Sequence, residues 1–391
     1  MNFDIREKTE KYITTLIQSP GNYKGTRGTM LLLWLLGQLS RLYRAVVQFR
    51  HFLYAKRIFR HHTLGCQVIS VGNLTVGGTG KTPVVEIFAR ELQKAGRKVA
   101  ILSRGYKKEE LSFWEKITKK FSLGELTEPP RVVSDGTKLL LDSAMSGDEP
   151  YMLASNLPNV CVLVDKNRVK SGRYAINKMG CDTLILDDGF QYLSLKHRVE
   201  IVLVDKTNPF GNEKMLPRGV LREPIRNIKR ADFIFITKSD GQGIDDLRNR
   251  LRQLNKRADI IECRHCARYL QNVFTAERKP LEFLDGLKVS VVSGIAVPGG
   301  FESELEKKGA IIVDRNRFAD HHRYGEQEII DIVNTSIRLE ANAIITTEKD
   351  AVRFPRLFRC DVPVYFLRVD IEILSGSEDF HKWISRICFK V

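Results

Sequence analysis

Residues 75–82 read Thr75-Val-Gly-Gly-Thr-Gly-Lys-Thr82 and decide the fold class of this 391-residue chain. The short β-branched run Gln67–Val71 precedes them, and Pro83–Lys94 follows with the composition of a helix that carries proline in its first turn. A glycine-rich loop between a buried strand and a helix is typical of a phosphate-binding P-loop. Such loops usually open with Gly, where this chain has Thr75, but three glycines and both flanking elements argue against a chance glycine-rich turn.

The residues of this loop have separate chemical roles in a nucleotide site. The glycines let backbone N–H groups converge on phosphate oxygens, Lys81 reaches the β- and γ-phosphates, and Thr82 supplies a hydroxyl to Mg²⁺. The helix N-terminus adds its partial positive charge. The residues expected at the nucleotide are Thr75, Val76, Gly77, Gly78, Thr79, Gly80, Lys81 and Thr82.

Candidate acidic groups follow the loop. The expected strand Thr183–Leu186 delivers Asp187 and Asp188 at its carboxyl end, where open α/β sheets bind their ligands. Two adjacent carboxylates can serve Mg²⁺ there, directly or through water, although an Asp that caps the next turn is the alternative. Asp148, in Gly147-Asp-Glu-Pro150, is a candidate catalytic base for phosphoryl transfer, and a helix N-cap explains it equally well.

Strands and helices alternate along most of the chain, which predicts an α/β fold. We expect a P-loop NTPase-like parallel sheet with flanking helices, an N-terminal amphipathic helix before it, and a second, smaller α/β lobe after it. The expected segments are 1–62 for membrane contact, 63–280 for the nucleotide-binding domain and 281–391 for the smaller lobe. The strands expected in the lobe are Leu287–Val292, Ala310–Val313, Ala343–Thr346 and Val362–Phe366.

Positive charge is concentrated near the N-terminus. The chain carries 63 Lys and Arg against 47 Asp and Glu, and no carboxylate occurs between Glu10 and Glu86. Apolar residues recur there at helical spacing, which predicts a basic amphipathic helix lying on an anionic membrane surface, with packing on the protein's own core as the alternative. The apolar run Met30–Leu36 is far shorter than the ~20 residues of a membrane-spanning helix. The apolar face comprises Leu35, Leu39, Leu42, Val46, Phe49 and Leu53.

Cysteine usage argues against a disulfide framework. The chain has an odd number of cysteines, 7, scattered along its length, which favours a reducing compartment. Cys263-Arg-His-Cys266 has metal-ligand spacing, but no second pair follows, so two ordinary thiols beside a strand are the preferred interpretation. The charged stretch 107–130 reads as an exposed insertion without an assignable function.

Several segments, taken together, resemble the tetraacyldisaccharide 4′-kinases, which phosphorylate the lipid A precursor. They occur in the family's order between about residue 20 and residue 355, so the match is much more specific than the P-loop alone. Thr75 is no longer anomalous, because the family's loop resembles this one there. The segments are Val71–Pro83, Ser103–Tyr106, Gly147–Pro150, Leu186–Gln191, Leu216–Pro224, Phe318–Tyr324 and Thr346–Asp350.

The resemblance implies ATP-dependent transfer to the 4′-hydroxyl of a tetraacylated glucosamine disaccharide 1-phosphate at the cytoplasmic face of the bacterial inner membrane. Its implied cofactors are ATP and Mg²⁺, and its implied partners are this lipid and an anionic membrane surface, without nucleic acid or a protein partner. The N-terminal helix would dock on the bilayer that carries the substrate, as a peripheral or monotopic anchor.

The resemblance also assigns residues. Asp148 would be the general base and His321 would orient it, although the adjacent His322 is the other candidate. We expect Asp148 and the histidine to meet in a cleft between the two lobes. Arg222 and Glu223 would form the loop that borders the nucleotide or its metal. The implied metal side comprises Thr82, Asp187, Asp188 and Glu223.

Two other classes of protein compete with a kinase. The strand end Thr237-Lys-Ser-Asp240 looks like the guanine-reading motif of GTPases, which suggests a membrane-attached GTPase switch. That interpretation leaves Asp148, Arg222 and His321 without a role. A basic nucleic-acid motor rests on the net charge of +16 alone, and no zinc-finger or RNA-binding signature supports it.

Overall fold

The computed structural model describes residues 26–105, 128–355 and 361–389, and these residues form two compact units. Most of the insertion expected at 107–130 lies outside the described residues. In its described parts, unit 1 comprises residues 26–104, 165–264 and 373–389, and unit 2 comprises residues 105, 128–164, 265–355 and 361–372. This division differs from the boundary expected near residue 280, because the chain enters unit 2 twice and returns to unit 1 each time.

Unit 1 contains a parallel sheet with the strand order β8-β7-β6-β1-β5-β2, as the α/β prediction requires. The chain passes from β1 to β2 on one side of β1 and later from β5 to β6 on its other side, so the sheet has its switch point at the carboxyl end of β1. The elements of this unit are α2 (Arg27–Ala55), β1 (Gln67–Asn73), α3 (Lys81–Lys94), β2 (Val99–Ser103), α7 (Arg168–Met179), β5 (Thr183–Asp187), β6 (Val199–Asp205), the 3₁₀ helix η2 (Ile225–Arg230), β7 (Phe233–Thr237), α8 (Asp245–Leu254), the first part of β8 (Asp259–Asn272) and α12 (Ser377–Phe389).

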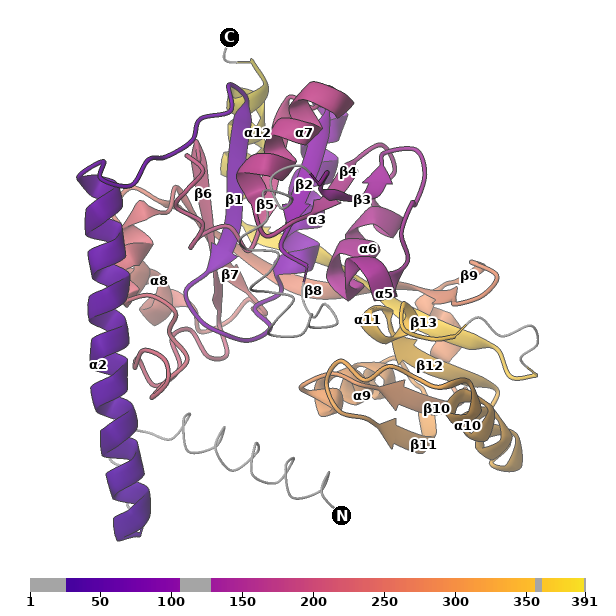
Figure 1. Ribbon diagram of the computed structural model, residues 1–391. Helices are drawn as coiled ribbons and strands as arrows, with labels where there is room; N and C mark the ends of the chain where they lie inside the picture. The colour runs from indigo at the N-terminus through magenta and orange to yellow at the C-terminus, as the bar shows by residue number, and fades with distance from the viewer. Residues whose placement is uncertain (1–25, 106–127, 356–360, 390–391) are drawn as a thin grey trace. The chain divides into compact units, whose positions relative to one another are not determined.

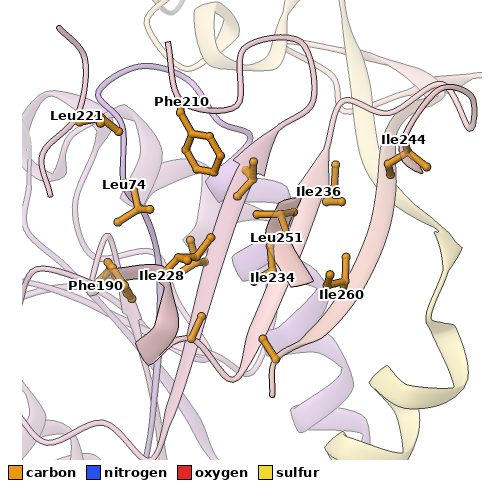
Figure 2. Packing of buried hydrophobic residues seen from close by; sticks show 14 of the residues in the cluster. Leu74, Phe190, Phe210, Leu221, Ile228, Ile234, Ile236, Ile244, Leu251 and Ile260 are labelled. Carbon is orange, nitrogen blue, oxygen red and sulfur yellow. The ribbon is translucent and has the colours of Figure 1, made fainter. Parts of the chain in front are cut away.

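The core of unit 1 explains why its apolar runs become strands. Every residue of β1, β2, β5 and β7 is buried, as expected for parallel strands covered on both faces. Figure 2 shows one part of this core, where Ile234 and Ile236 of β7 lie near Leu251 of α8. Phe190 and Leu74, which follow β5 and β1, belong to the same cluster. The loops after these two strands are therefore fixed by apolar packing.

Helix α2 packs on unit 1 with one face and exposes another (Figure 1). Tyr43 and Val47 pack against the core cluster, and Ser40 Oγ donates to the carbonyl of Met215 at 2.9 Å. The predicted apolar face is a different one, since Leu35, Leu39, Leu42, Val46 and Phe49 are all exposed. The helix therefore does pack on the protein's own core, but not with the face that the sequence pattern suggested for membrane contact.

The length of α2 corrects one expectation. The apolar run Met30–Leu36 is short, but it is part of a continuous helix of 29 residues. By length and composition alone, this helix is sufficient to cross a membrane, and its most apolar window is 6% buried. The argument against spanning from the length of the apolar run is therefore wrong, because helical structure continues through Arg41 and Arg44.

Unit 2 contains four neighbouring parallel strands, β11-β10-β12-β13, and an antiparallel pair, β3 and β4. All four strands expected in the smaller lobe are present, and two apolar clusters pack against them. Its elements are β3 (Arg131–Asp135), α5 (Ser143–Ser146), α6 (Asp148–Asn156), β4 (Cys161–Val164), the last part of β8, β9 (Arg278–Lys279), η3 (Leu281–Leu284), β10 (Lys288–Ser293), α9 (Pro298–Lys307), β11 (Ile311–Arg317), α10 (Glu326–Arg338), β12 (Ala343–Thr347), α11 (Glu348–Ala351) and most of β13 (Val364–Ser375).

Candidate functional sites

The loop between β1 and α3 has the geometry of a phosphate site. Gly77 and Gly80 adopt positive φ angles of 114° and 77°, which favour glycine. Gly80 is the N-cap of α3, so the helix begins at Lys81 and directs its first backbone N–H groups toward the loop. A Cβ added to Gly77 or Gly78 would meet no atom within 4 Å, so the space beside these two residues is open. Backbone amides and open space together form an anion site.

The rest of the predicted loop supports this geometry. Thr75 is buried and bridges to Leu221, and the N–H of Val76 donates to the carbonyl of Val220 at 2.8 Å. Thr79 is buried, and its carbonyl accepts a hydrogen bond from the hydroxyl of Thr237 at 2.9 Å. Thr82 is the second residue of α3, within the turn that faces the loop. The loop is thus held at one end by the segment at Val220 and Leu221 and near its other end by β7.

Lys81, Asp188 and Arg222 form an ion-pair group beside this loop. Arg222 donates from Nη1 to both carboxylate oxygens of Asp188, at 2.9 and 2.7 Å, and Lys81 Nζ lies 3.6 Å from Oδ1. Burial raises the pKa of Asp188, but the charges of Lys81 and Arg222 outweigh it and hold the pKa below its ordinary value. Asp188 therefore remains ionised, with two cations that phosphate oxygens could also attract.

Asp187 lies beside this group but has different partners. It ends β5, is buried, and accepts a hydrogen bond at Oδ2 from the hydroxyl of Ser103 at 3.0 Å. Its backbone carbonyl accepts from Arg168 at 3.2 Å. Asp187 and Asp188 thus stand at the carboxyl end of a central strand, as the sequence predicted.

Glu223 does not join the expected metal ligands. It is 1% exposed, and both of its oxygens are occupied: Oε1 by Arg230 at 3.3 Å, and Oε2 by Asn227 at 2.7 Å and His51 at 3.0 Å. Among the residues that the structure describes, no three His, Cys, Asp or Glu side chains are grouped to hold a metal ion. The physical reason is that α2 and η2 supply the donors that neutralise this buried carboxylate.

Unit 2 brings Asp148 and His321 together. His321 Nδ1 lies 3.3 Å from Asp148 Oδ2, and Arg353 Nε donates to the same oxygen at 2.8 Å. The other oxygen, Oδ1, is buried without a hydrogen-bond partner among the described residues, and Arg323 Nη2 lies 3.6 Å away. Both members of the pair belong to unit 2, so the expectation that they come from opposite lobes is wrong.

The local structure explains why Asp148 faces this group. Gly147 has φ 93° and is the N-cap of α6, so Asp148 is the first helical residue and not the cap. Burial raises the pKa of Asp148, but the hydrogen bond with His321 and the charges of Arg353 and Arg323 hold the pKa below its ordinary value. The carboxylate is therefore ionised near neutral pH and can accept a proton through its second oxygen.

The neighbouring histidine has a different environment. His322 Nε2 lies 3.0 Å from Glu328 Oε2, and its ring stacks on Phe318 with centroids 4.7 Å apart. Of the two adjacent histidines, His321 is therefore the one that contacts Asp148.

Arg353 is the residue that sequence reasoning missed. Its side chain has no exposed surface, and it pairs with Asp350 at 3.0 Å as well as with Asp148. The one signal for it is position: it follows the segment Thr346–Asp350 by three residues, so a helical turn places its guanidinium beside Asp350.

The GTPase-like segment Thr237–Asp240 and the cysteine pair Cys263 and Cys266 have ordinary structural roles. Asp240, which a GTPase would use to read guanine, has its carboxylate bound by Lys206, and Lys238 pairs with Asp205 at 2.6 Å. Cys263 is buried, and burial raises the pKa of its thiol to about 12, which disfavours the thiolate that a metal requires. Cys266 is a free thiol.

The sheet order and the loop at its switch point define a P-loop nucleotide-binding α/β protein. The family described as "Tetraacyldisaccharide-1-P 4'-kinase" matches residues 32–388. This chain belongs to that family, and the resemblance inferred from its motifs is confirmed. The competing GTPase interpretation receives no support from these relatives.

Named relatives extend over nearly the whole chain. The tetraacyldisaccharide 4'-kinase of Halothermothrix orenii is 34% identical over 98% of this chain and 99% of its own length. That of Desulfotalea psychrophila is 38% identical over 90% of this chain and 95% of its own length. LpxK from Aquifex aeolicus, solved in complex with ATP, superposes with a TM-score of 0.69 at 28% identity, over 92% of this chain and 100% of its own.

Proposed function

We propose that this chain transfers the γ-phosphate of ATP to the 4′-hydroxyl of a tetraacyldisaccharide 1-phosphate in lipid A biosynthesis. The observation that carries the proposal is the open glycine loop before α3, with Lys81 beside Asp188 and Arg222. Membership of the kinase family supports the substrate class, and the solved relative with bound ATP supports the nucleotide.

The residues of unit 1 would bind the triphosphate. Backbone N–H groups of Gly78, Gly80 and Lys81 would hold phosphate oxygens, and the ammonium of Lys81 would neutralise charge on the terminal phosphates. Arg222 is already aligned by both oxygens of Asp188, so its guanidinium is oriented before the nucleotide arrives. Orienting charges before binding lowers the cost of reorganisation during transfer.

A Mg²⁺ ion fits the oxygen donors in unit 1. Mg²⁺ in phosphoryl-transfer sites takes one or two carboxylates together with phosphate oxygens and water. Thr82 at the start of α3 and Asp187 with Asp188 at the end of β5 are such donors, whereas Glu223 is occupied by other residues. When bound, the ion would neutralise the β- and γ-phosphate oxygens.

Asp148 would act as the general base. Phosphoryl transfer requires removal of the proton from the acceptor hydroxyl, and an ionised carboxylate can accept it through Oδ1, which has no hydrogen bond from any residue that the structure describes. His321 and Arg353 hold the other oxygen, which fixes the direction in which Oδ1 faces. His321 Nδ1 also lies 3.2 Å from Arg353 Nη2, which can only donate, so His321 donates to Asp148 in the tautomer that carries its proton on Nδ1 and accepts from Arg353 in the other.

Helix α2 would place the enzyme on the membrane that carries its lipid substrate. Its exposed face offers leucines and aromatic residues, with arginines on neighbouring faces, which suits a helix in the headgroup layer. Between Ser40 and Tyr54 the helix is docked on unit 1, so at most Arg27–Leu39 could be surrounded by lipid. That stretch is about 20 Å long, shorter than the ~30 Å hydrocarbon core. We therefore propose a monotopic anchor at the cytoplasmic face.

The direct test is transfer of labelled phosphate. The purified protein would be incubated with γ-labelled ATP, Mg²⁺ and tetraacyldisaccharide 1-phosphate in mixed micelles, and the lipid would be examined for label. We expect label at the 4′ position, and none when the 4′-hydroxyl is replaced by hydrogen. Label that appears only in free phosphate, with or without the lipid, would contradict the proposed acceptor.

A further inference from the structure

The buried carboxylate of Glu223 joins three parts of unit 1. It accepts hydrogen bonds from Asn227 and Arg230 of η2, and His51 of α2 lies 3.0 Å from its Oε2. Burial raises the pKa of Glu223, but the bond with His51 and the charge of Arg230 outweigh it, so the pKa lies below its ordinary value. An ionised carboxylate with 1% exposure requires these donors, because an unpaired buried charge is strongly destabilising.

This carboxylate is connected to the two segments that carry Arg222 and Asp188 of the nucleotide site. Arg222, the preceding residue, holds Asp188 through both carboxylate oxygens. Arg230 donates to the backbone carbonyl of Phe190 at 2.9 Å, and its guanidinium lies over the Phe190 ring at 4.0 Å from the centroid. Phe190 follows Asp188 by two residues, so the position of Arg230 bears on the loop after β5.

His51 of α2 contacts both Glu223 and Arg230. Arg230 Nη1, which can only donate, lies 2.9 Å from Nδ1 of His51 and 3.2 Å from its Nε2, and Nε2 lies 3.0 Å from Glu223 Oε2, which accepts. The neutral tautomer with its proton on Nε2 can donate to Glu223 and leaves Nδ1 to accept from Arg230. The imidazole serves as a bridge that accepts from one side chain and donates to the other.

We propose that His51 is a positioning residue through which α2 sets the geometry of the nucleotide site. When α2 is seated on unit 1, His51 completes the coordination of Glu223 and Arg230, and these hold Arg222 and the loop of Asp188 in place. A displacement of α2 at the membrane would then change the positions of Arg222 and Asp188, which lie at the phosphate site. This inference rests on the proposed use of the P-loop for ATP.

A matched pair of α2 variants tests the role. His51→Ala removes the bridge, whereas Tyr54→Phe removes another anchor of the same helix, the 2.9 Å contact with the Ser194 hydroxyl, which does not touch Glu223. We expect His51→Ala to raise the KM for ATP by about 5-fold or more, while kcat changes less than about 2-fold. Tyr54→Phe should leave both constants unchanged.

A conservative variant separates positioning from general loss of structure. His51→Gln keeps one acceptor and one donor, so it should restore the KM for ATP to within about 2-fold of the original protein. Glu223→Gln removes the charge that the bridge serves and should raise the KM for ATP in the same direction as His51→Ala. Each variant would be checked by thermal unfolding before kinetics.

The outcomes are decisive. An unchanged KM for ATP in His51→Ala, or an equal rise in Tyr54→Phe, would overturn the inference. If His51→Ala does not fold, Glu223→Gln and His51→Gln decide: an unchanged KM in the first, or an unrescued KM in the second, overturns it. Absence of phosphate transfer by the unaltered protein would instead refute the proposed function, so the two failures are distinguishable.

Discussion

Arg353 donates its Nε–H to Oδ2 of Asp148 at 2.8 Å, and the arginine side chain has no exposed surface. A buried guanidinium beside a carboxylate favours the ionised carboxylate and restricts its rotation. Because Arg353 also pairs with Asp350, its own position is fixed from two sides. The ionisation and the direction of Asp148 thus depend on a residue in the turn after α11.

The pH dependence of turnover should report this contact. Arg353 and Arg323 both hold the pKa of Asp148 below its ordinary value, so removing either charge raises that pKa. The rate falls as pH decreases through the pKa of an essential base. We expect the acid limb of kcat against pH to move upward in Arg353→Met and, by less, in Arg323→Ala, whose guanidinium lies 3.6 Å away. A limb that stays in place in both variants would exclude Asp148 as the titrating group.

Replacing the base itself should affect chemistry more than nucleotide binding. Asp148→Asn keeps the shape of the side chain but cannot accept the acceptor proton, so kcat should fall by roughly 10²-fold or more. The KM for ATP should change less than about 2-fold, because the loop that binds phosphate belongs to unit 1. Steady-state kinetics with Asp331→Asn, an exposed carboxylate on α10, as control would check this. Equal losses in the two variants would contradict it.

Two glycines near the nucleotide site should respond oppositely to alanine. A Cβ at Gly72 would lie 2.7 Å from the Cβ and 2.8 Å from the backbone nitrogen of Phe190, so Gly72→Ala should cost about 1–3 kcal/mol of unfolding free energy. A Cβ at Gly78 meets open space, so Gly78→Ala should keep its stability but weaken ATP binding where phosphate must approach the backbone. Urea unfolding and ATP titration would measure both. A stable Gly72→Ala protein would show that the strand can shift.

The exposed face of α2 should determine membrane binding. Leu39 and Phe49 are 52% and 61% exposed, and placing glutamate at both removes apolar burial and adds repulsion from anionic lipid. We expect the double variant to lose at least about 10-fold in affinity for anionic vesicles by co-sedimentation. The control is Ile337→Glu, a residue of α10 that is 49% exposed. A similar loss in that variant would attribute binding to general hydrophobicity.

Local sequence patterns were sufficient to predict the strands and the phosphate-binding loop. Thr183–Asp187 is buried throughout, as expected for a short apolar run that forms a parallel strand covered on both faces of the sheet. The conformation of the loop at Gly77 and Gly80 was predictable because positive φ angles favour glycine, and these glycines are visible in the sequence. Each of these features depends on residues close together in the chain.

Features that depend on distant partners were not predictable. Nothing near Glu223 indicates that its carboxylate is buried, since His51 lies on a helix far earlier in the chain. Arg353 meets Asp148 across 205 positions, and one sequence shows no sign of that pairing. The helix that contains Met30–Leu36 was, in contrast, predicted from its apolar spacing, because a helix accommodates the intervening arginines on separate faces.

Helix α12 returns to unit 1 and completes the packing around the helix that starts at the P-loop. Phe380 contacts Phe88 of α3 with ring centroids 5.0 Å apart, and Trp383 contacts Phe233 of β7 at 4.5 Å. During synthesis on the ribosome, the nascent chain therefore makes its glycine loop hundreds of residues before the aromatic partners of α3 and β7 emerge. A premature stop before Ile373 would leave these rings open to water, and such a truncated product should be a substrate for chaperones and proteases rather than a weak enzyme.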